Sequence, residues 1–144
     1  QLFNRIYKGM PFYTYGVTGY IDVRDVVKAM ILLTNSDKIV NERFILNSQN
    51  LSYKEVFTLI AKNLGKKPPS LEVKPWMIKL VFPILKLFGT LTGKGAAISH
   101  DNLNSVFSKT LYSSKKIESQ TGFIFTPIAD SVKFIGTAYQ NNSL

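Results

Sequence analysis

Residues 19–29 constrain the fold more than any other stretch, because they combine a strand end, a helix cap and an amphipathic helix. The aromatic and β-branched residues at the start favour extended backbone, and the hydrophobic period then becomes helical. Asp22 can accept the free N–H groups of the first helical turn. Asp25 occupies the acidic position of a capping box. We expect a strand end and then a helix to about Thr34 that buries one apolar face, made of Val23, Val26, Val27, Met30 and Leu33. On pattern alone this is an ordinary strand-to-helix transition.

The rest of the chain predicts more helices than strands. Short strands are expected at Pro11–Tyr15 and Arg43–Leu46, with a turn at Gly16–Gly19 and a brief extended stretch at Leu71–Val73. Ser52 and Glu55 form a capping-box pair ahead of a helix that Gly65 ends. Further helices are expected at 1–8, from Pro75 to Phe88 with a kink at Pro83, at 99–106, from Ser113 or Ser114 to Gly122, and from Pro127 to Tyr139. We predict a helix-rich α/β fold with a few short strands, one domain over residues 1–140, and a frayed tail at 141–144.

Composition limits the compartment and the partners. The 144 residues are 45% hydrophobic, which argues against disorder, and carry a formal net charge of +9 with no cysteine. The absence of cysteine suits the reducing cytoplasm, where we place the chain. Nearly all the positive charge comes from lysines spread singly along the helices, which favours a solvated surface and no nucleic-acid partner. The alternative is a stand-alone basic module that docks on a membrane surface or nucleic acid.

No residue of this chain is assigned a catalytic or metal-binding role. Tyr112 and Lys116 match the spacing of a Tyr-x-x-x-Lys acid/base pair, but Tyr112 precedes the expected helix cap, so both side chains would not share a helix face. Gly93-Lys94-Gly95 lacks the preceding strand of a phosphate loop. His100 is the single histidine of the sequence, which rules out a histidine-pair metal site.

Several motifs together resemble the C-terminal half of extended short-chain dehydrogenases/reductases, the NAD(P)-dependent epimerase/dehydratase family. They are Gly19–Ala29, Arg43–Asn47, Asn50–Glu55, and later Ser114-Lys115, Thr121–Phe123 and Pro127. The likeness is greatest to the dihydroflavonol-reductase and hydroxysteroid-dehydrogenase-like branch. It implies the C-terminal part of an NAD(P)-binding Rossmann-type enzyme. The glycine-rich cofactor loop and the catalytic Tyr-x-x-x-Lys would lie upstream, so NAD or NADP would bind the parent protein and not this chain alone.

The same resemblance implies a small-molecule site. Tyr15, Gly16, Thr18 and Tyr20 would face the substrate, and Trp76 would form part of a lid. In sugar-nucleotide epimerases of this family an Arg-Asp pair often precedes the Tyr-Ile step, where this chain has Thr18 and Gly19. That difference implies an apolar or weakly polar substrate. The alternative is that these aromatic residues belong to the core. The remaining partner would be the missing N-terminal Rossmann half, and without it we expect the chain to self-associate through exposed residues such as Val26, Met30, Phe44 and Leu46.

Overall fold

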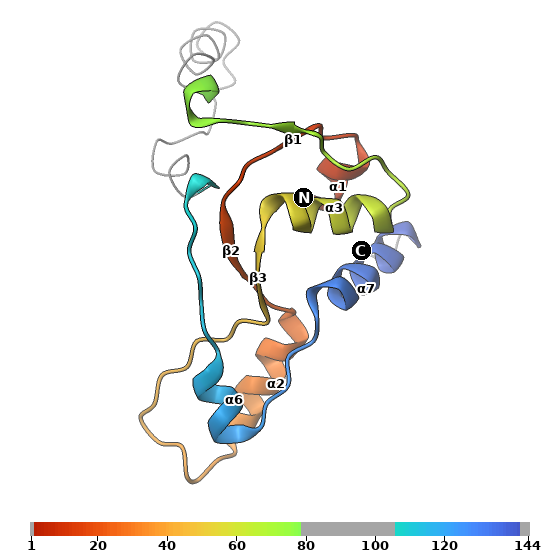
Figure 1. Cartoon of the computed structure of the whole chain (residues 1–144). Helices are drawn as coiled ribbons and strands as arrows, with labels where there is room; N and C mark the ends of the chain where they lie inside the picture. The colour runs from red at the N-terminus through yellow and green to blue at the C-terminus, as the bar shows by residue number, and fades with distance from the viewer. Residues whose placement is uncertain (1, 79–105, 142–144) are drawn as a thin grey trace, which may run out of the picture.

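The computed structural model describes residues 2–78 and 106–141, and it confirms a mixed α/β, helix-rich fold with few short strands. Figure 1 shows two groups of elements joined by the central strands β2 and β3. In chain order the elements are α1 (Leu2–Tyr7), β1 (Phe12–Tyr13), β2 (Val17–Tyr20), α2 (Val23–Thr34), β3 (Gln49–Ser52), α3 (Tyr53–Asn63), β4 (Leu71–Glu72), α6 (Lys115–Thr121) and α7 (Ile128–Gln140).

The strands of the described residues pair two by two. β2 and β3 run antiparallel, with Val17 opposite Ser52 and Tyr20 opposite Gln49. β1 and β4 run parallel, with Phe12 opposite Leu71. The predicted turn at Gly16–Gly19 is therefore wrong, because most of that stretch forms β2. Gly16 is needed there for the close approach of the Val106 backbone, and Gly19 for that of the Asn47 and Tyr112 side chains.

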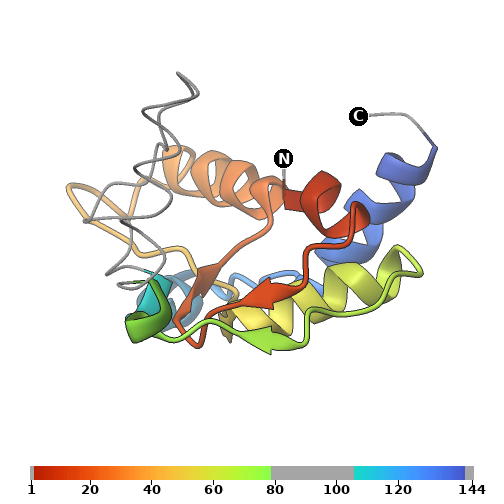
Figure 2. The ribbon, with the colours of Figure 1, turned by 90° about the horizontal axis from the view of Figure 1, so that it is seen from above.

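The main core lies between α1, α3 and α7 (Figure 2). Gly136 of α7 is buried where the helix faces α3, and a Cβ at this position would clash with the Asn63 side chain. Glycine at position 136 therefore lets the Asn63 side chain lie directly against α7. The cluster of buried apolar side chains consists of Ile6, Val56, Ile60, Ala61, Leu64, Ile128 and Val132.

The predicted cap of α2 is confirmed, but the role predicted for Asp25 is wrong. An Asp22 carboxylate oxygen accepts a hydrogen bond from the backbone N–H of Arg24 at 2.8 Å, as an N-cap does. The Asp25 carboxylate does not turn back toward the cap. It accepts hydrogen bonds from the backbone N–H and the hydroxyl of Thr126 at 2.5 and 3.0 Å. Asp25 therefore joins α2 to the link before α7.

The predicted buried face of α2 is wrong for three of its five residues, while the other two, Val26 and Leu33, are half-buried. Val23, Val27 and Met30 have exposed fractions of 72%, 51% and 61%, while the helix buries Asp25 and Ala29 on another side. The tertiary hydrogen bonds of Asp25 orient the helix, and they turn the apolar residues outward. In Figure 2, α2 lies along one edge of the described part of the molecule.

The strand predicted at Arg43–Leu46 is absent from the structure. Residues 43–47 have no regular secondary structure, and the chain enters a strand only at β3. A strand needs a partner for its backbone groups, and the described residues provide none for residues 44–46. The β-forming side chains of this stretch are therefore not sufficient to make a strand here.

The predicted ends of the later helices are confirmed. Ser52 and Glu55 form a complete capping box at α3, and Gly122 ends α6 in the left-handed conformation with φ of 67°. Pro127 precedes the first residue of α7, as expected. On α7, Ile128 and Val132 are buried and Ile135 is exposed.

Several predictions fall wholly or partly outside the described residues. These are the apolar run after Ile78 with its kink, the Gly93-Lys94-Gly95 loop, His100 and the last three residues of the tail. Residues 75–78 are helical, as predicted for the turn that Pro75 begins. Among the helices of the described chain, none has the length and apolar character needed to cross a bilayer.

Candidate functional site

The predicted substrate residues lie on and just before β2, except Trp76. Tyr15 and Gly16 precede the strand, and Thr18 and Tyr20 alternate along it, which places their side chains on one face. Trp76 lies on the helical turn 75–78 after β4, with 61% of its surface exposed. The structure thus brings four of the five residues onto one short strand and its approach.

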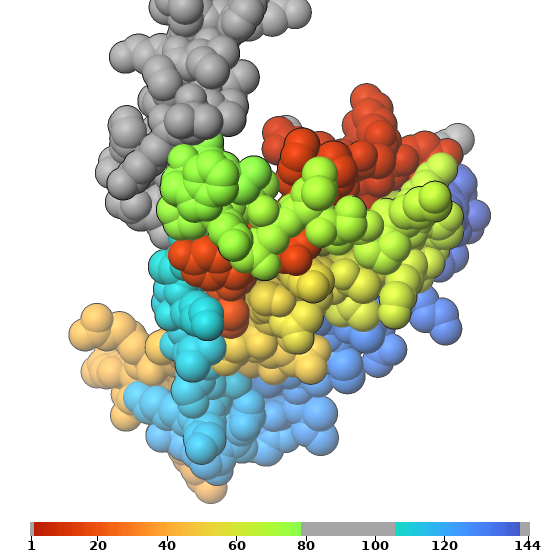
Figure 3. Space-filling model, turned by 45° about the horizontal axis from the view of Figure 1, so that its top comes forward, coloured from red at the N-terminus to blue at the C-terminus, as the bar shows by residue number. Residues whose placement is uncertain are grey.

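Segment 106–112 borders this strand on the edge opposite β3. The Val17 N–H donates to the Ser108 carbonyl at 3.0 Å, and the Thr110 N–H donates to the Val17 carbonyl at 2.9 Å. Figure 3 shows the segment, in cyan, running along β2 and down to α6. A Cβ at Gly16 would clash with the carbonyl oxygen of Val106. Glycine at this position therefore lets the two backbones approach.

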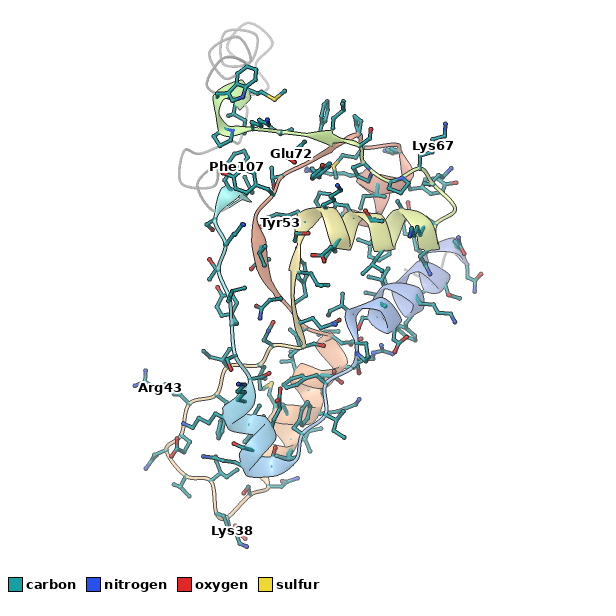
Figure 4. The ribbon with its side chains drawn as sticks, in the orientation of Figure 1. Lys38, Arg43, Tyr53, Lys67, Glu72 and Phe107 are labelled. Atoms are coloured by element: carbon teal, nitrogen blue, oxygen red, sulfur yellow. The ribbon has the colours of Figure 1, made fainter. Side chains whose placement is uncertain are left out.

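Aromatic rings gather where the segment begins. The rings of Tyr15 and Phe107 are 5.4 Å apart between centroids and tilted by 47°. The Tyr53 N–H donates to the Gly16 carbonyl at 3.1 Å, which brings the start of α3 to the same place. Figure 4 labels Phe107 and Tyr53 near the upper part of β2. This aromatic end of β2 suits an apolar or planar ligand group.

Two asparagines hold segment 106–112 in position, and the sequence analysis did not identify either. The Asn50 amide accepts from the Tyr112 N–H at 2.9 Å and donates to the Tyr112 carbonyl at 2.8 Å. Asn47 also donates to that carbonyl, at 3.2 Å, and its Oδ1 is buried without a hydrogen-bond partner among the described residues. A Cβ at Gly19 would lie 2.5 Å from that oxygen and 2.8 Å from the Tyr112 ring.

Tyr20 is the predicted site residue with the most perturbed acidity. Burial, together with the nearby Tyr53, raises the pKa of Tyr20 to about 12. Its ring packs against the apolar core cluster between α1, α3 and α7. A phenol with such a pKa stays protonated at neutral pH, so Tyr20 can pack or donate a hydrogen bond but is a poor base.

The carboxylates at the start of α2 are structural and stay ionised. Hydrogen bonds from the Arg24 side chain hold the pKa of Asp22 far below its usual range against the opposing effect of burial, and Ser131 donates a further one at 2.6 Å. For Asp25, burial raises the pKa, but the hydrogen bonds from Thr126 and Lys28 outweigh burial and lower it. Both carboxylates are fully engaged, which leaves neither for acid/base chemistry.

The Tyr112–Lys116 pair does not form a catalytic dyad. Tyr112 lies outside any helix, and Lys116 belongs to α6. The Lys116 ammonium forms an ion pair with Glu42 and donates to the Arg43 carbonyl at 3.1 Å. The prediction that these residues do not share a helix is confirmed.

Two further features bear on ligands. A surface hollow of about 460 Å³ lies beside the link from α6 to α7, lined by Ser48, Gln49, Glu118, Gly122, Phe123, Ile124, Phe125 and Pro127. It contains none of the predicted substrate residues.

In the described parts of the chain, no group of three histidine, cysteine, aspartate or glutamate side chains is placed to hold a metal ion.

The comparisons with known proteins define the fold of the chain and no family. No family model matches the sequence. No curated protein matches it either. Among solved structures, the crystal structure of gox2253 is similar, with a TM-score of 0.71 and 22% sequence identity. The match covers 97% of this chain and 42% of the gox2253 chain. This chain therefore has the fold of a part of a longer polypeptide and spans less than half of that protein's length.

Proposed function

We propose that this chain is the substrate-binding, C-terminal portion of an NAD(P)-dependent reductase or epimerase of the extended short-chain dehydrogenase/reductase type. The proposal is carried by where the resembling sequence motifs lie in the structure. Asp22 caps α2 directly after β2, Ser52 and Glu55 cap α3 directly after β3, and Gly122 ends α6. These helix ends are where three of the resembling motifs were expected, whereas the Arg43–Asn47 motif forms no strand here. The similarity of nearly the whole chain to less than half of gox2253 also supports a part of a larger protein.

The described residues do not fit a dinucleotide site by themselves. A phosphate-binding loop of this class is a glycine-rich turn between a strand and a helix. In the described residues, the strand-to-helix junctions are β2–α2, where Asp22 caps the helix, and β3–α3, where Ser52 does. Neither carries the glycines that bring backbone close to a pyrophosphate. The proposal therefore assigns NAD or NADP to a preceding N-terminal half. As a separate point, it places the protein in the cytoplasm.

In this proposal the substrate lies against β2 and segment 106–112. Tyr15 and Phe107 provide apolar contact, and Thr18 provides a hydroxyl on the same strand. Asn47 and Asn50 position the segment through the Tyr112 backbone. Tyr20, on the same face of β2 as Thr18, is partly buried against the core and supports the end of the strand. The preceding half would complete the pocket and supply the acid/base pair.

The test uses the longer chain encoded when the reading frame is extended upstream. We expect it to oxidise NADH or NADPH with carbonyl compounds that carry apolar groups. Because Tyr15 would contact the substrate and not the reacting atoms, Tyr15→Ala should raise KM about tenfold with kcat within a few-fold. Val40→Ala, at a 65% exposed apolar position outside β2 and segment 106–112, is the control and should change neither constant.

Two results would contradict the proposal. One is a longer chain that binds neither dinucleotide, and the other is a Tyr15→Ala variant whose KM equals that of the control. Retention of the 144-residue chain on anionic vesicles or nucleic acid, lost at high salt, would instead support the basic docking module.

A further inference from the structure

The basic charge of the described chain is concentrated at one end. This end, called the β1–β4 end below, consists of α1, β1, α3, β4 and the turn that follows, within residues 2–16 and 53–78. It carries seven basic and two acidic side chains, whereas residues 17–52 carry four of each. The seven basic residues are Arg5, Lys8, Lys54, Lys62, Lys66, Lys67 and Lys74. Lysines that are spread along the sequence are therefore gathered at one end of the fold.

These basic side chains are exposed and form no ion pair with a described residue. The ion pairs that the structure shows are made by Arg24, Lys28 and Lys116, at the opposite end of the molecule. Of the two acids at the β1–β4 end, Glu55 is engaged in the capping box of α3, and Glu72 lies in β4. The excess positive charge therefore faces solvent, where it attracts an anionic partner.

Large apolar side chains are exposed among these lysines. Phe12 and Leu71 are opposite each other in the parallel pair β1–β4, so they lie on the same face of the pair, and their exposed fractions are 51% and 54%. Tyr13, which points to the other face, is buried. Trp76, on the turn after β4, is 61% exposed. The β1–β4 pair therefore presents apolar side chains outward, which marks a surface that binds a partner.

The basic and apolar side chains belong to neighbouring elements. The Lys66 ammonium lies 4.3 Å from the centroid of the Tyr7 ring, which is 47% exposed. The Leu71 N–H donates to the Pro11 carbonyl at 3.0 Å, which holds β4 beside the chain that follows α1. Figure 3, in which the top of the molecule comes forward, shows α1 in red and β4 in green together at this end. They form one basic and apolar surface.

We propose that the β1–β4 end is a docking surface for an anionic lipid bilayer. Exposed aromatic and aliphatic side chains among lysines are typical of proteins that lie in the membrane interface, and tryptophan is enriched there. Phe12, Leu71 and Trp76 enter the boundary between headgroups and acyl chains, and the lysines around them bind the anionic headgroups. The inference does not rest on the proposed function, because it uses only this surface.

Two other macromolecular partners fit this surface less well. Nucleic-acid binders favour arginine, whose planar guanidinium pairs with a phosphate through two hydrogen bonds, and this end has six lysines and one arginine. A nucleic acid also offers no apolar layer for Phe12 and Leu71. Protein interfaces are depleted in lysine. A bilayer with anionic lipids supplies both the charge and the apolar layer.

The fluorescence of Trp76 tests the proposal directly, since it is the single tryptophan of the sequence. The 144-residue chain is mixed with vesicles of phosphatidylcholine that contain phosphatidylglycerol and, separately, with vesicles of phosphatidylcholine alone. With the anionic vesicles we expect a blue shift of the emission and quenching by brominated acyl chains. Binding to the neutral vesicles should be about tenfold weaker or more. Equal binding to both vesicles, or no shift with the anionic ones, would overturn the proposal.

Charge-reversal variants test which end of the molecule docks. Lys66→Glu combined with Lys67→Glu should weaken binding to the anionic vesicles about tenfold or more. Lys38→Glu combined with Lys115→Glu is the matched control, because it has the same net charge but changes lysines at the opposite end, where Figure 4 labels Lys38. The control should weaken binding by less than about threefold. Equal losses in the two double variants would overturn the assignment to the β1–β4 end.

A pair of serine variants tests the apolar contact. Leu71→Ser should weaken binding to the anionic vesicles about tenfold, because a leucine side chain then no longer enters the interface. Val40→Ser, at a 65% exposed apolar position outside the β1–β4 end, is the control and should leave binding unchanged. Complete release at high salt, with equal binding of the two variants at low salt, would show a contact by charge alone and would overturn the insertion of this surface.

The same measurements on the chain extended upstream separate this inference from the proposed function. Binding of both chains to the anionic vesicles supports the docking surface, whether or not the longer chain binds a dinucleotide. Binding by the 144-residue chain alone would show that the preceding part covers the β1–β4 end, and would overturn the proposal for the whole protein. Tighter binding to a DNA or RNA oligonucleotide than to the vesicles would overturn it in favour of a nucleic-acid partner.

Discussion

Replacement of Asp22 by alanine tests how the start of α2 is held. The carboxylate caps the helix through the Arg24 N–H and accepts a hydrogen bond from Ser131, whose side chain is buried on α7. Losing the cap costs about 1 kcal/mol, and losing the buried hydrogen bond costs about 1 kcal/mol more. The ion pair with Arg24 is left out of this sum, because the guanidinium is open to solvent. We expect the free energy of unfolding to fall by about 2 kcal/mol.

Urea unfolding of the wild type and four variants measures this loss and separates its two parts. Asp22→Asn keeps an N-cap acceptor and should cost less than Asp22→Ala. Ser131→Ala should cost about 1 kcal/mol. In the double variant the two losses should not add, because both substitutions remove the same hydrogen bond. A loss below about 0.5 kcal/mol for Asp22→Ala, the size of an ordinary surface substitution, would refute the reasoning.

Three other variants or conditions test separate contacts. The pKa of Asp25 is lower in the folded protein than its ordinary value of 3.8, so the ionised carboxylate stabilises the fold above that pH and this stabilisation is lost as the pH falls below it. The free energy of unfolding, followed by circular dichroism, should therefore fall less steeply with decreasing pH for Asp25→Asn than for the wild type. An equal slope for the two proteins would contradict this. Gly136→Ala should lower the free energy of unfolding by about 1–3 kcal/mol, because the added methyl group meets Asn63; Asn63→Ala in the same chain should restore part of the loss. Tyr112→Phe in the longer protein should keep turnover within a few-fold of wild type, and a thousandfold loss would show that its hydroxyl takes part in proton transfer.

Local patterns predicted the ends of elements more accurately than their surroundings. The caps at Asp22 and Ser52 and the end at Gly122 depend on residues within one turn, so the sequence contains all the information they need. The partner of Asp25 lies 101 residues away, and nothing in the spacing of α2 indicates it. The same limit applies to Asn50, whose partner is 62 residues away.

The two largest differences between prediction and structure concern the same surface. The apolar face of α2 was predicted to be buried, and residues 43–46 were predicted to form a strand. Both predictions follow from correct local preferences, since α2 is amphipathic and residues 43–46 are rich in β-formers. Burial and strand pairing need a second surface as well. The described residues do not supply one, so these preferences are not realised in the 144-residue chain.

Of the candidate site, Tyr15, Gly16 and Thr18 were named from the family resemblance, and the structure places them on β2 and just before it. Tyr20 also lies on β2, with its ring partly buried against the core, and its role in the site stays a prediction. Phe107 was not anticipated, since its contact with Tyr15 spans more than ninety residues of chain. A contact between distant segments depends on the tertiary fold, which a short motif does not encode.

Dinucleotide titration tests the central claim most directly. NADH and NADPH are titrated separately into the 144-residue chain and into the chain extended upstream, with intrinsic fluorescence and calorimetry as the two readouts. The account predicts that the longer chain binds one of them with a micromolar dissociation constant, and that the 144-residue chain shows no saturable binding. Micromolar binding of either dinucleotide by the 144-residue chain as a monomer would contradict the assignment of the cofactor to a preceding half.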